Sequence, residues 1–131
     1  MLLRDSFGDA RVDYATTIAG LAERSNLSPA RIIPDFNAHK PLKTLFGGAV
    51  VAWMVMWSPA TVIVSTGAAP GLIALIVGRM TGRRTIWIDS IANPERLSLC
   101  GRFAGRFADL WLTQWEHLAK PGGPTFSGAV L

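Results

Sequence analysis

The chain has 131 residues, enough for one domain with its own core and too few for two ordinary domains. Half of the residues are hydrophobic, the formal charge is +4, and the thirteen Lys and Arg residues are scattered along the sequence. Scattered charge argues against a nucleic-acid-binding protein, whose arms show basic blocks. An apolar, basic chain with five Trp residues instead suits an anionic membrane surface. We therefore expect a single domain over residues 1–131 that binds no nucleic acid.

The sequence also argues against metal-binding, disulfide-bonded and membrane-spanning proteins. Cys100 is the single cysteine, so no internal disulfide forms. His39 and His117 are far apart, and no Cys or His spacing is typical of a zinc site. The longest apolar run, residues 45–57, is shorter than the roughly 20 residues that a transmembrane helix needs. We expect no metal site and no ordinary helix that crosses a bilayer.

Strands and helices are predicted to alternate along the chain. Short strands are expected at residues 12–17 and 31–36, the second at a sheet edge because Pro34 interrupts it. The later elements are a helix at 41–57, strands at 61–65, 84–89 and 109–113, and helices at 71–80 and 96–108. This order implies βαβ units and an α/β fold, with a Rossmann-like parallel sheet and flanking helices. Residues 121–128 are expected to form a flexible tail or a linker to a missing edge strand.

The predicted helix at residues 41–57 is apolar nearly all round. Such a helix is either buried or lies against lipid. The sequence leaves open whether its large side chains face lipid, a partner chain or the domain's own core. Arg102 and Arg106, four residues apart on a later helix, are either solvated or in contact with lipid phosphates. The candidate membrane or partner contacts are Phe46, Trp53, Met54, Trp57, Arg102 and Arg106.

The loop "STGAAPG" at residues 65–71 is the first candidate ligand site. Gly67 and Gly71 would let the backbone approach a bulky group. Pro70 suits the first turn of the following helix, whose free amides favour an anion. These features make Thr66, Gly67 and Gly71 candidates for binding a phosphate. The alternative is a tight turn between strand and helix that serves packing alone.

Two further loops follow predicted strands. Asp89 ends a strand and precedes Ser90, Asn93 and Arg96, which places a possible base beside a cation; the alternative is that Asp89 accepts hydrogen bonds from backbone amides. Glu116 follows the last predicted strand, and the alternative there is a capping segment around a core Trp. Because ligands in parallel sheets bind beyond the carboxyl ends of strands, we expect all three loops at one edge.

These three loops, in this order, resemble the asparagine-linked-glycosylation-fourteen-like proteins. That family comprises the eukaryotic membrane-anchoring subunit of the UDP-N-acetylglucosamine transferase and bacterial relatives in exopolysaccharide and capsule synthesis. The resemblance covers residues 12–118. Its motif positions here are Ser65, Thr66, Gly67, Asp89, Ser90, Arg96, Ser98, Gly101, Asp109, Gln114 and Trp115.

The resemblance implies the N-terminal, acceptor-side half of a GT-B glycosyltransferase that is split across two chains. A partner subunit of similar fold would bind most of the UDP-sugar donor, and no other cofactor is implied. The acceptor would be a polyprenyl-pyrophosphate-linked sugar. The chain would lie, peripheral or monotopic, on the cytoplasmic face of a membrane, in bacteria the inner membrane.

One departure from the family pattern concerns the start of the sequence. Family members begin with a strand and a glycine-rich loop ending in Gly-Gly-His, and this sequence has no counterpart of either. No residue inherits that histidine's role, so Asp89 and Glu116 are the catalytic candidates and edges beside the lacking strand should be exposed. The alternatives are a non-catalytic membrane scaffold and an inactive fragment of such a subunit. A stand-alone nucleotide-binding domain is disfavoured because the sequence has no GxGxxG motif.

Overall fold

The strands form two parallel sheets. The computed structural model describes residues 7–18, 20, 24, 30–34, 41–92 and 94–129. One sheet has four strands in the order β3-β4-β5-β6, with bounds β3 Val62–Ser65, β4 Arg84–Ile88, β5 Leu110–Thr113 and β6 Thr125–Phe126. The other pairs β1 (Tyr14–Thr16) with β2 (Ala30–Ile32), also in parallel. The expected parallel α/β fold is therefore confirmed.

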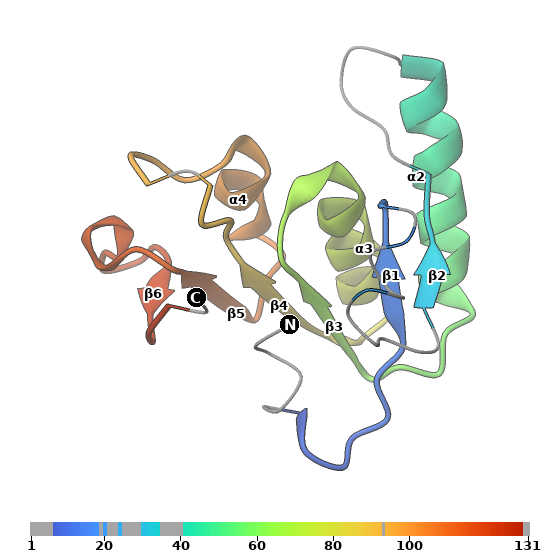
Figure 1. The fold of residues 1–131 in the computed structure, drawn as a ribbon, viewed down its shortest axis with the longest axis horizontal. Helices are drawn as coiled ribbons and strands as arrows, with labels where there is room; N and C mark the ends of the chain where they lie inside the picture. Colours follow the sequence, from blue (N-terminus) through green and yellow to red (C-terminus); the bar gives the residue numbers. More distant parts are fainter. Residues whose placement is uncertain are drawn as a thin grey trace.

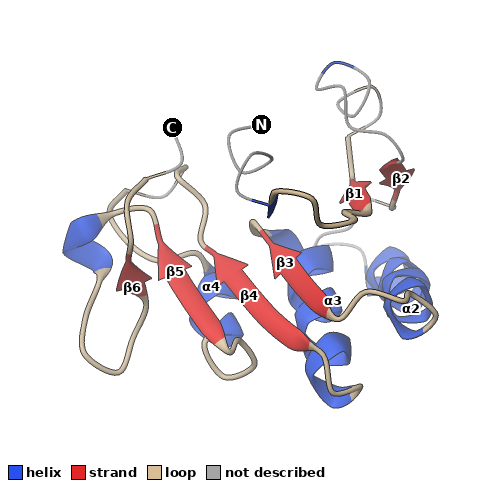
Figure 2. Ribbon diagram, turned by 90° about the horizontal axis from the view of Figure 1, so that it is seen from below, coloured by secondary structure: helices blue, strands red, loops and turns tan. Residues whose placement is uncertain are grey.

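The two sheets do not join. Figures 1 and 2 show β1 and β2 beside β3, with β1 the nearer of the two. Within the described part of the chain, β3 is hydrogen-bonded only to β4. Val62 of β3 is 42% exposed. Among the described residues, β3 is therefore the end strand of the four-stranded sheet.

Three helices form a row on one side of the four-stranded sheet (Figures 1 and 2). These helices are α2 (Pro41–Met56), α3 (Ala68–Met80) and α4 (Leu99–Ala104). The middle helix, α3, packs against both of the others and covers β3 and β4. A short 3₁₀ helix, η2 (Glu116–Leu118), follows β5.

Several predicted boundaries are wrong. The α3 helix begins at Ala68 and not at residue 71, because Gly67 (φ 132°) makes the turn and Pro70 falls within the first helical turn. The α4 helix is shorter than residues 96–108: it begins at Leu99, because Ser98 caps it, and it ends at Ala104. The strand predicted at 31–36 ends before Pro34, and residues 35–36 lie outside the described residues.

The tail at residues 121–128 also differs from expectation. Thr125 and Phe126 form β6, which pairs in parallel with β5. Pro124 just before it is almost completely buried. Gly122, with φ 71°, makes the turn that brings the chain back to the sheet. The segment therefore supplies an edge strand.

The core consists of two buried clusters on the helical side of the sheet. Val51 and Val55 of α2 pack with Ile33. Leu75 of α3 packs with Trp87 of β4 and with Ala104. Helix α3 lies close to the sheet because Gly78 faces Ile63, where a Cβ would come within 2.8 Å of its Cγ1 atom.

Helix α2 buries one face and exposes the other. Gly47, Val51 and Val55 are buried, and the two valines pack with Ile33 and with side chains of α3. The opposite face is unpartnered among the described residues; its large apolar members are Leu42, Leu45, Phe46, Trp53, Met56 and Trp57. Met54 differs from the other predicted contacts, because it is partly buried and packs against the Val51–Val55 cluster. No helix in the described part of the chain is long and apolar enough to cross a membrane.

Candidate functional site

The three candidate loops lie together at the carboxyl edge of the sheet. β3, β4 and β5 are parallel, so the loops that follow them emerge at the same edge (Figure 1). The Gln114 side-chain amide donates to the Asp89 carbonyl at 2.9 Å, which links the third loop to the second. A Cβ on Gly67 would lie 3.9 Å from the Ser90 Cβ, so the first loop lies next to the second.

A second link joins the two later loops. The Nε2 atom of His117 is within hydrogen-bonding distance of the Pro94 carbonyl oxygen. Because a carbonyl only accepts, this partner assigns the proton to Nε2. His117 also lies against Trp115, with ring centroids 6.0 Å apart. No local sequence pattern predicts this contact, because Pro94 and His117 are 23 positions apart.

The first loop combines a strained turn with an open helix end. The Gly67 amide donates to the Ser65 hydroxyl at 3.3 Å, and Ala68 has a left-handed backbone with φ 64°. A non-glycine residue in that conformation is uncommon and often marks a functional turn. No side chain caps the first turn of α3, so its free amides are available to an anion. Thr66 is exposed beside them.

Gly71 has a packing role within this loop. A Cβ at this position would collide with the Ser65 hydroxyl and would lie 3.7 Å from the Trp87 ring. The position therefore needs glycine so that α3 can approach β3. Gly67 is the glycine whose backbone conformation shapes the turn itself.

Asp89 is buried, with 2% of its surface exposed, and both of its carboxylate oxygens are occupied. Oδ1 accepts from the Ser98 hydroxyl at 2.6 Å and from the Trp87 indole N–H at 3.2 Å. Oδ2 accepts from the Ser98 backbone N–H at 3.0 Å. The Ser98 hydroxyl in turn accepts from the Gly101 amide at 2.8 Å and so caps α4. These contacts match the alternative left open by the sequence, in which Asp89 holds its own loop.

Arg96 and Glu116 are the exposed charged groups of the predicted site. Neither forms an ion pair with any residue that the structure describes. Ser90 is half-buried, and its hydroxyl accepts from the Ala92 amide at 3.2 Å. Asn93 lies outside the described residues. The edge therefore presents a cation, a carboxylate and free helix amides to a ligand.

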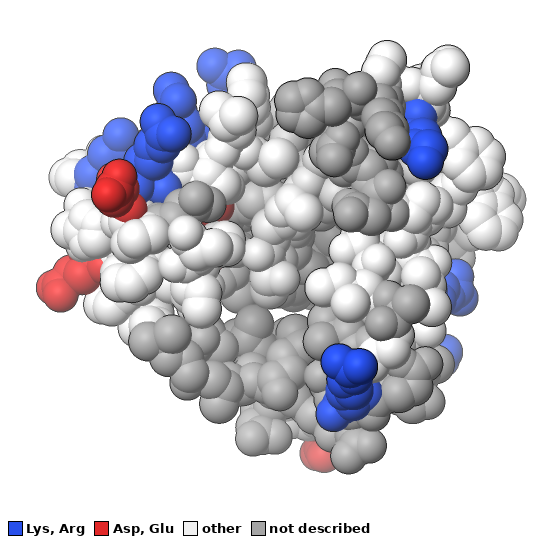
Figure 3. Space-filling model, turned by 45° about the horizontal axis from the view of Figure 1, so that its top comes forward, with Lys and Arg blue, Asp and Glu red and all other residues white. Residues whose placement is uncertain are grey.

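Figure 3 shows this edge tilted toward the viewer. Basic side chains gather at its upper left, with acidic side chains nearby, whereas the right side carries few charges. Arg102 and Arg106 are both exposed, as are Phe46, Trp53 and Trp57 of the predicted membrane or partner contacts.

Two further groups lie near the edge. The Trp115 indole N–H is buried without an acceptor among the described residues. Burial, followed by the charge of Asp89, raises the pKa of the Cys100 thiol, so Cys100 stays protonated at neutral pH. Among the described residues, no three His, Cys, Asp or Glu side chains gather as a possible metal site.

Comparison with known proteins finds one sequence relative and one structural relative of note. Over 65 residues the chain is 35% identical to the UDP-N-acetylglucosamine transferase subunit ALG14 of Eremothecium gossypii. The aligned segment covers 45% of this chain and 29% of that protein. The fold is similar to that of Acinetobacter baumannii MurG, with a TM-score of 0.63 and 11% identity, over 81% of this chain and 32% of MurG. No protein-family model matches the chain.

The two relatives support different statements. The likeness to MurG shows a Rossmann-like α/β fold. The likeness to the ALG14 protein is a partial sequence relationship to a glycosyltransferase subunit, in line with the resemblance found from the loops. The chain spans less than a third of the length of that relative.

Proposed function

We propose that this chain is the acceptor-side subunit of a two-chain glycosyltransferase. The complex would transfer a sugar from a UDP-sugar to a polyprenyl-pyrophosphate-linked acceptor. The observation that carries the proposal is the meeting of three loops at the carboxyl edge, where open α/β sheets bind ligands. The similarity to a UDP-N-acetylglucosamine transferase subunit favours N-acetylglucosamine as the transferred sugar.

The acceptor's phosphate groups would bind at the start of α3. The uncapped first turn offers backbone N–H groups at the positive end of the helix dipole. Thr66 and Arg96 are exposed at the same edge and would add a hydroxyl and a guanidinium. A guanidinium suits phosphate because it donates two parallel hydrogen bonds.

Glu116 is the group best placed to act as the general base. Its carboxylate would take the proton of the acceptor hydroxyl as that oxygen bonds to the sugar's anomeric carbon and UDP leaves with the electron pair of the broken bond. Asp89 is less suited to this step, since neutral donors occupy both of its oxygens. We assign Asp89 the role of a positioning residue that fixes the second loop.

The donor would bind mainly to a partner chain of similar fold. In support, the sequence relative is itself named as a subunit of a UDP-N-acetylglucosamine transferase. The partner would cover the carboxyl edge, so that donor and acceptor meet between the two chains. No cofactor beyond the UDP-sugar is needed for this reaction.

Helix α2 would hold the complex to the cytoplasmic face of a membrane, in bacteria the inner membrane. Phe46, Trp53 and Trp57 are 69%, 61% and 75% exposed. Trp suits the interface between lipid and water, and an apolar helical face of this kind lies in the plane of the bilayer. The net charge of +4 favours an anionic leaflet.

Transfer can be measured on membranes from cells that express the full chain together with a candidate donor-binding chain. With radiolabelled UDP-N-acetylglucosamine, we expect product only when both chains are present. Glu116→Gln should lower kcat about a hundredfold, as expected for loss of a general base. Arg96→Ala should raise KM for the acceptor.

Matched controls are available on the same chain. Glu95→Gln changes an exposed neighbouring carboxylate, and Arg11→Ala removes an exposed arginine, so both should leave transfer unchanged. Normal transfer by both Glu116→Gln and Arg96→Ala in a stable two-chain complex would refute the catalytic roles and favour a non-catalytic scaffold. Product formed by this chain alone would refute the subunit proposal.

A further inference from the structure

His117 joins the second and third loops at the carboxyl edge of the sheet. It belongs to η2 and directly follows Glu116, the proposed general base. Its Nε2 atom contacts the Pro94 carbonyl oxygen of the second loop, and the loops after β4 and β5 lie side by side in Figure 1. The His117 side chain is nevertheless exposed, so a ligand at this edge can reach its ring.

The contact with Pro94 determines which ring nitrogen of His117 can accept a hydrogen bond. A carbonyl oxygen has no proton to donate, so in the neutral ring Nε2 carries the proton and Nδ1 has the free lone pair. Among the described residues, Nδ1 has no hydrogen-bond partner. The neutral imidazole therefore offers one acceptor atom to a ligand.

The orientation of this ring is held from two sides. Trp115 lies against it, with ring centroids 6.0 Å apart and an interplanar angle of 50°, and the Pro94 carbonyl holds the Nε2 end. A side chain that already has its bound orientation loses little conformational entropy when a ligand binds. The Nδ1 atom is therefore preorganised for a hydrogen bond.

A free lone pair selects ligand groups that donate a proton. Phosphate oxygens are acceptors, so the neutral ring does not suit the phosphate part of the acceptor. The start of α3 and the exposed Arg96 are available to that part. Hydroxyl groups donate as well as accept. The Nδ1 atom of His117 therefore suits the sugar part of the acceptor.

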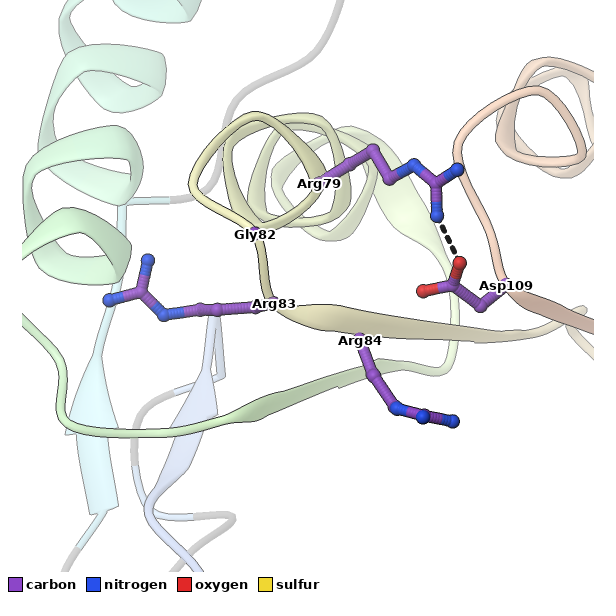
Figure 4. Close-up of a pocket in the computed structure, with 5 residues that line it drawn as sticks. All are labelled: Arg79, Gly82, Arg83, Arg84 and Asp109. Atoms are coloured by element: carbon purple, nitrogen blue, oxygen red, sulfur yellow. Dashed lines mark hydrogen bonds and ion pairs between the residues drawn. The ribbon is translucent and has the colours of Figure 1, made fainter.

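The opposite edge of the sheet shows no comparable convergence. An open pocket of about 440 Å³ there is lined by Arg79, Gly82, Arg83, Arg84 and Asp109. Figure 4 shows its three guanidinium groups pointing in different directions. Arg79 is paired with Asp109, and Arg83 donates to the Ala60 carbonyl at 2.9 Å. These two arginines therefore link parts of the fold, whereas the groups around His117 meet at one place.

We propose that Nδ1 of His117 accepts a hydrogen bond from a hydroxyl of the acceptor sugar, next to the hydroxyl that Glu116 deprotonates. His117 would thus help to select which hydroxyl faces Glu116 and forms the new linkage. No covalent bond forms or breaks at His117. This inference rests on the proposed function and adds to it a contact with the sugar of the acceptor.

Two substitutions separate the roles of the two ring nitrogens. In His117→Gln the side-chain amide can still donate to the Pro94 carbonyl, but no atom replaces Nδ1. In His117→Asn the shorter amide replaces Nδ1 and no longer reaches Pro94. Lys120→Gln, at an exposed residue of the same segment, is the control.

Transfer of radiolabelled N-acetylglucosamine is measured on membranes that contain both chains, with a lipid extract of the same cells titrated as the acceptor. We expect His117→Gln to raise KM for the acceptor about fivefold and to leave kcat within about twofold, because one hydrogen bond between neutral groups is lost. Lys120→Gln should match wild type in both constants. An unchanged KM for His117→Gln would overturn the inference, as would a lowered kcat at unchanged KM.

Limited trypsin cleavage after Arg96 measures whether the second loop stays in place. We expect the wild-type rate for His117→Gln and an about fivefold faster rate for His117→Asn, which loses the Pro94 contact. A raised KM for His117→Gln together with faster cleavage would assign the effect to the loop and overturn the sugar contact.

The proton position can be measured on the full chain alone. Long-range ¹H–¹⁵N correlation spectra should show the His117 proton on Nε2 at neutral pH, and a proton on Nδ1 would remove the acceptor atom and overturn the inference. If Glu116→Gln strongly lowers transfer but His117→Gln does not change KM, the proposed function stands and the sugar contact fails. Absence of transfer by the wild type in a stable two-chain complex would refute both.

Discussion

One aspartate lies at the carboxyl ends of the strands of the four-stranded sheet and another at their amino ends. The two carboxylates differ in burial and in their hydrogen-bond donors. At the carboxyl edge, Asp89 is buried and accepts from the backbone and hydroxyl of Ser98 and from Trp87, all neutral donors. At the amino edge, Asp109 is exposed to solvent, accepts from Thr85 and pairs with an arginine. Both carboxylates join distant segments of the chain.

The comparison shows that a carboxylate at the carboxyl ends of the strands can have a purely structural role, as the hydrogen bonds of Asp89 indicate. Removing Asp89 would leave buried donors without acceptors, which costs more than breaking an exposed ion pair. Glu116, the proposed general base, is exposed at the same edge. In the proposed function, stability and activity would therefore depend on different acidic residues of the same edge.

The largest effect is expected for Asp89→Ala. It would leave the Trp87 N–H and two Ser98 donors unpaired, and the free energy of unfolding should fall by about 3 kcal/mol. Urea unfolding measures the loss, and Glu116→Ala, an exposed carboxylate at the same edge, should change it by less than about 0.5 kcal/mol. A loss below about 1 kcal/mol for Asp89→Ala would mean that the carboxylate is not structural, and would restore it as a catalytic candidate.

Gly71→Ala should also destabilise the carboxyl edge, by about 2 kcal/mol, because its Cβ would collide with the Ser65 hydroxyl. Ser65→Ala removes the colliding atom, so the double variant should lose less than the sum of the two single variants. Thermal unfolding of the four proteins measures this coupling. Additive losses would show that the collision is not the cause.

Substitutions on the two faces of helix α2 should change the free energy of unfolding by different amounts. Val51 is 1% exposed, so Val51→Ala should lower the free energy of unfolding by about 2 kcal/mol. Trp53 on the opposite face is 61% exposed, and Trp53→Ser should change it by less than about 0.5 kcal/mol. A large loss from Trp53→Ser in the isolated chain would mean that the outer face is covered within the domain.

The smallest effect is expected at Asp109, and it should depend on pH. The Thr85 backbone N–H lowers the pKa of Asp109 below 3.8 most strongly, burial opposes the change, and the Arg79 charge adds to it. Because the unfolded chain binds the proton more tightly, the stabilisation is full above about pH 3.8 and is lost as pH falls through the lowered pKa. The urea midpoints of wild type and Asp109→Asn should therefore differ at neutral pH and converge in acid. A difference that persists in acid would assign the effect to packing.

Local sequence patterns predicted much of the fold. Continuous apolar runs identified β3, β4 and β5 within a residue or two, and the alternation with helices indicated the parallel sheet. The helix starts were less accurate. The start of α4 depends on Ser98 meeting Asp89, nine residues earlier, which no local pattern encodes.

The sequence by itself determined the order of the elements and the edge at which the three loops emerge, because strand direction and chain order settle both. Tertiary structure decided which face of α2 is buried, since a helix that is apolar nearly all round carries no periodic signal. It also decided that residues 125–126 pair with β5 and that Asp89 is a structural acceptor. These outcomes depend on contacts between residues that are distant in the sequence. Such contacts stabilise the structure only after the chain has folded, so no local sequence pattern predicts them.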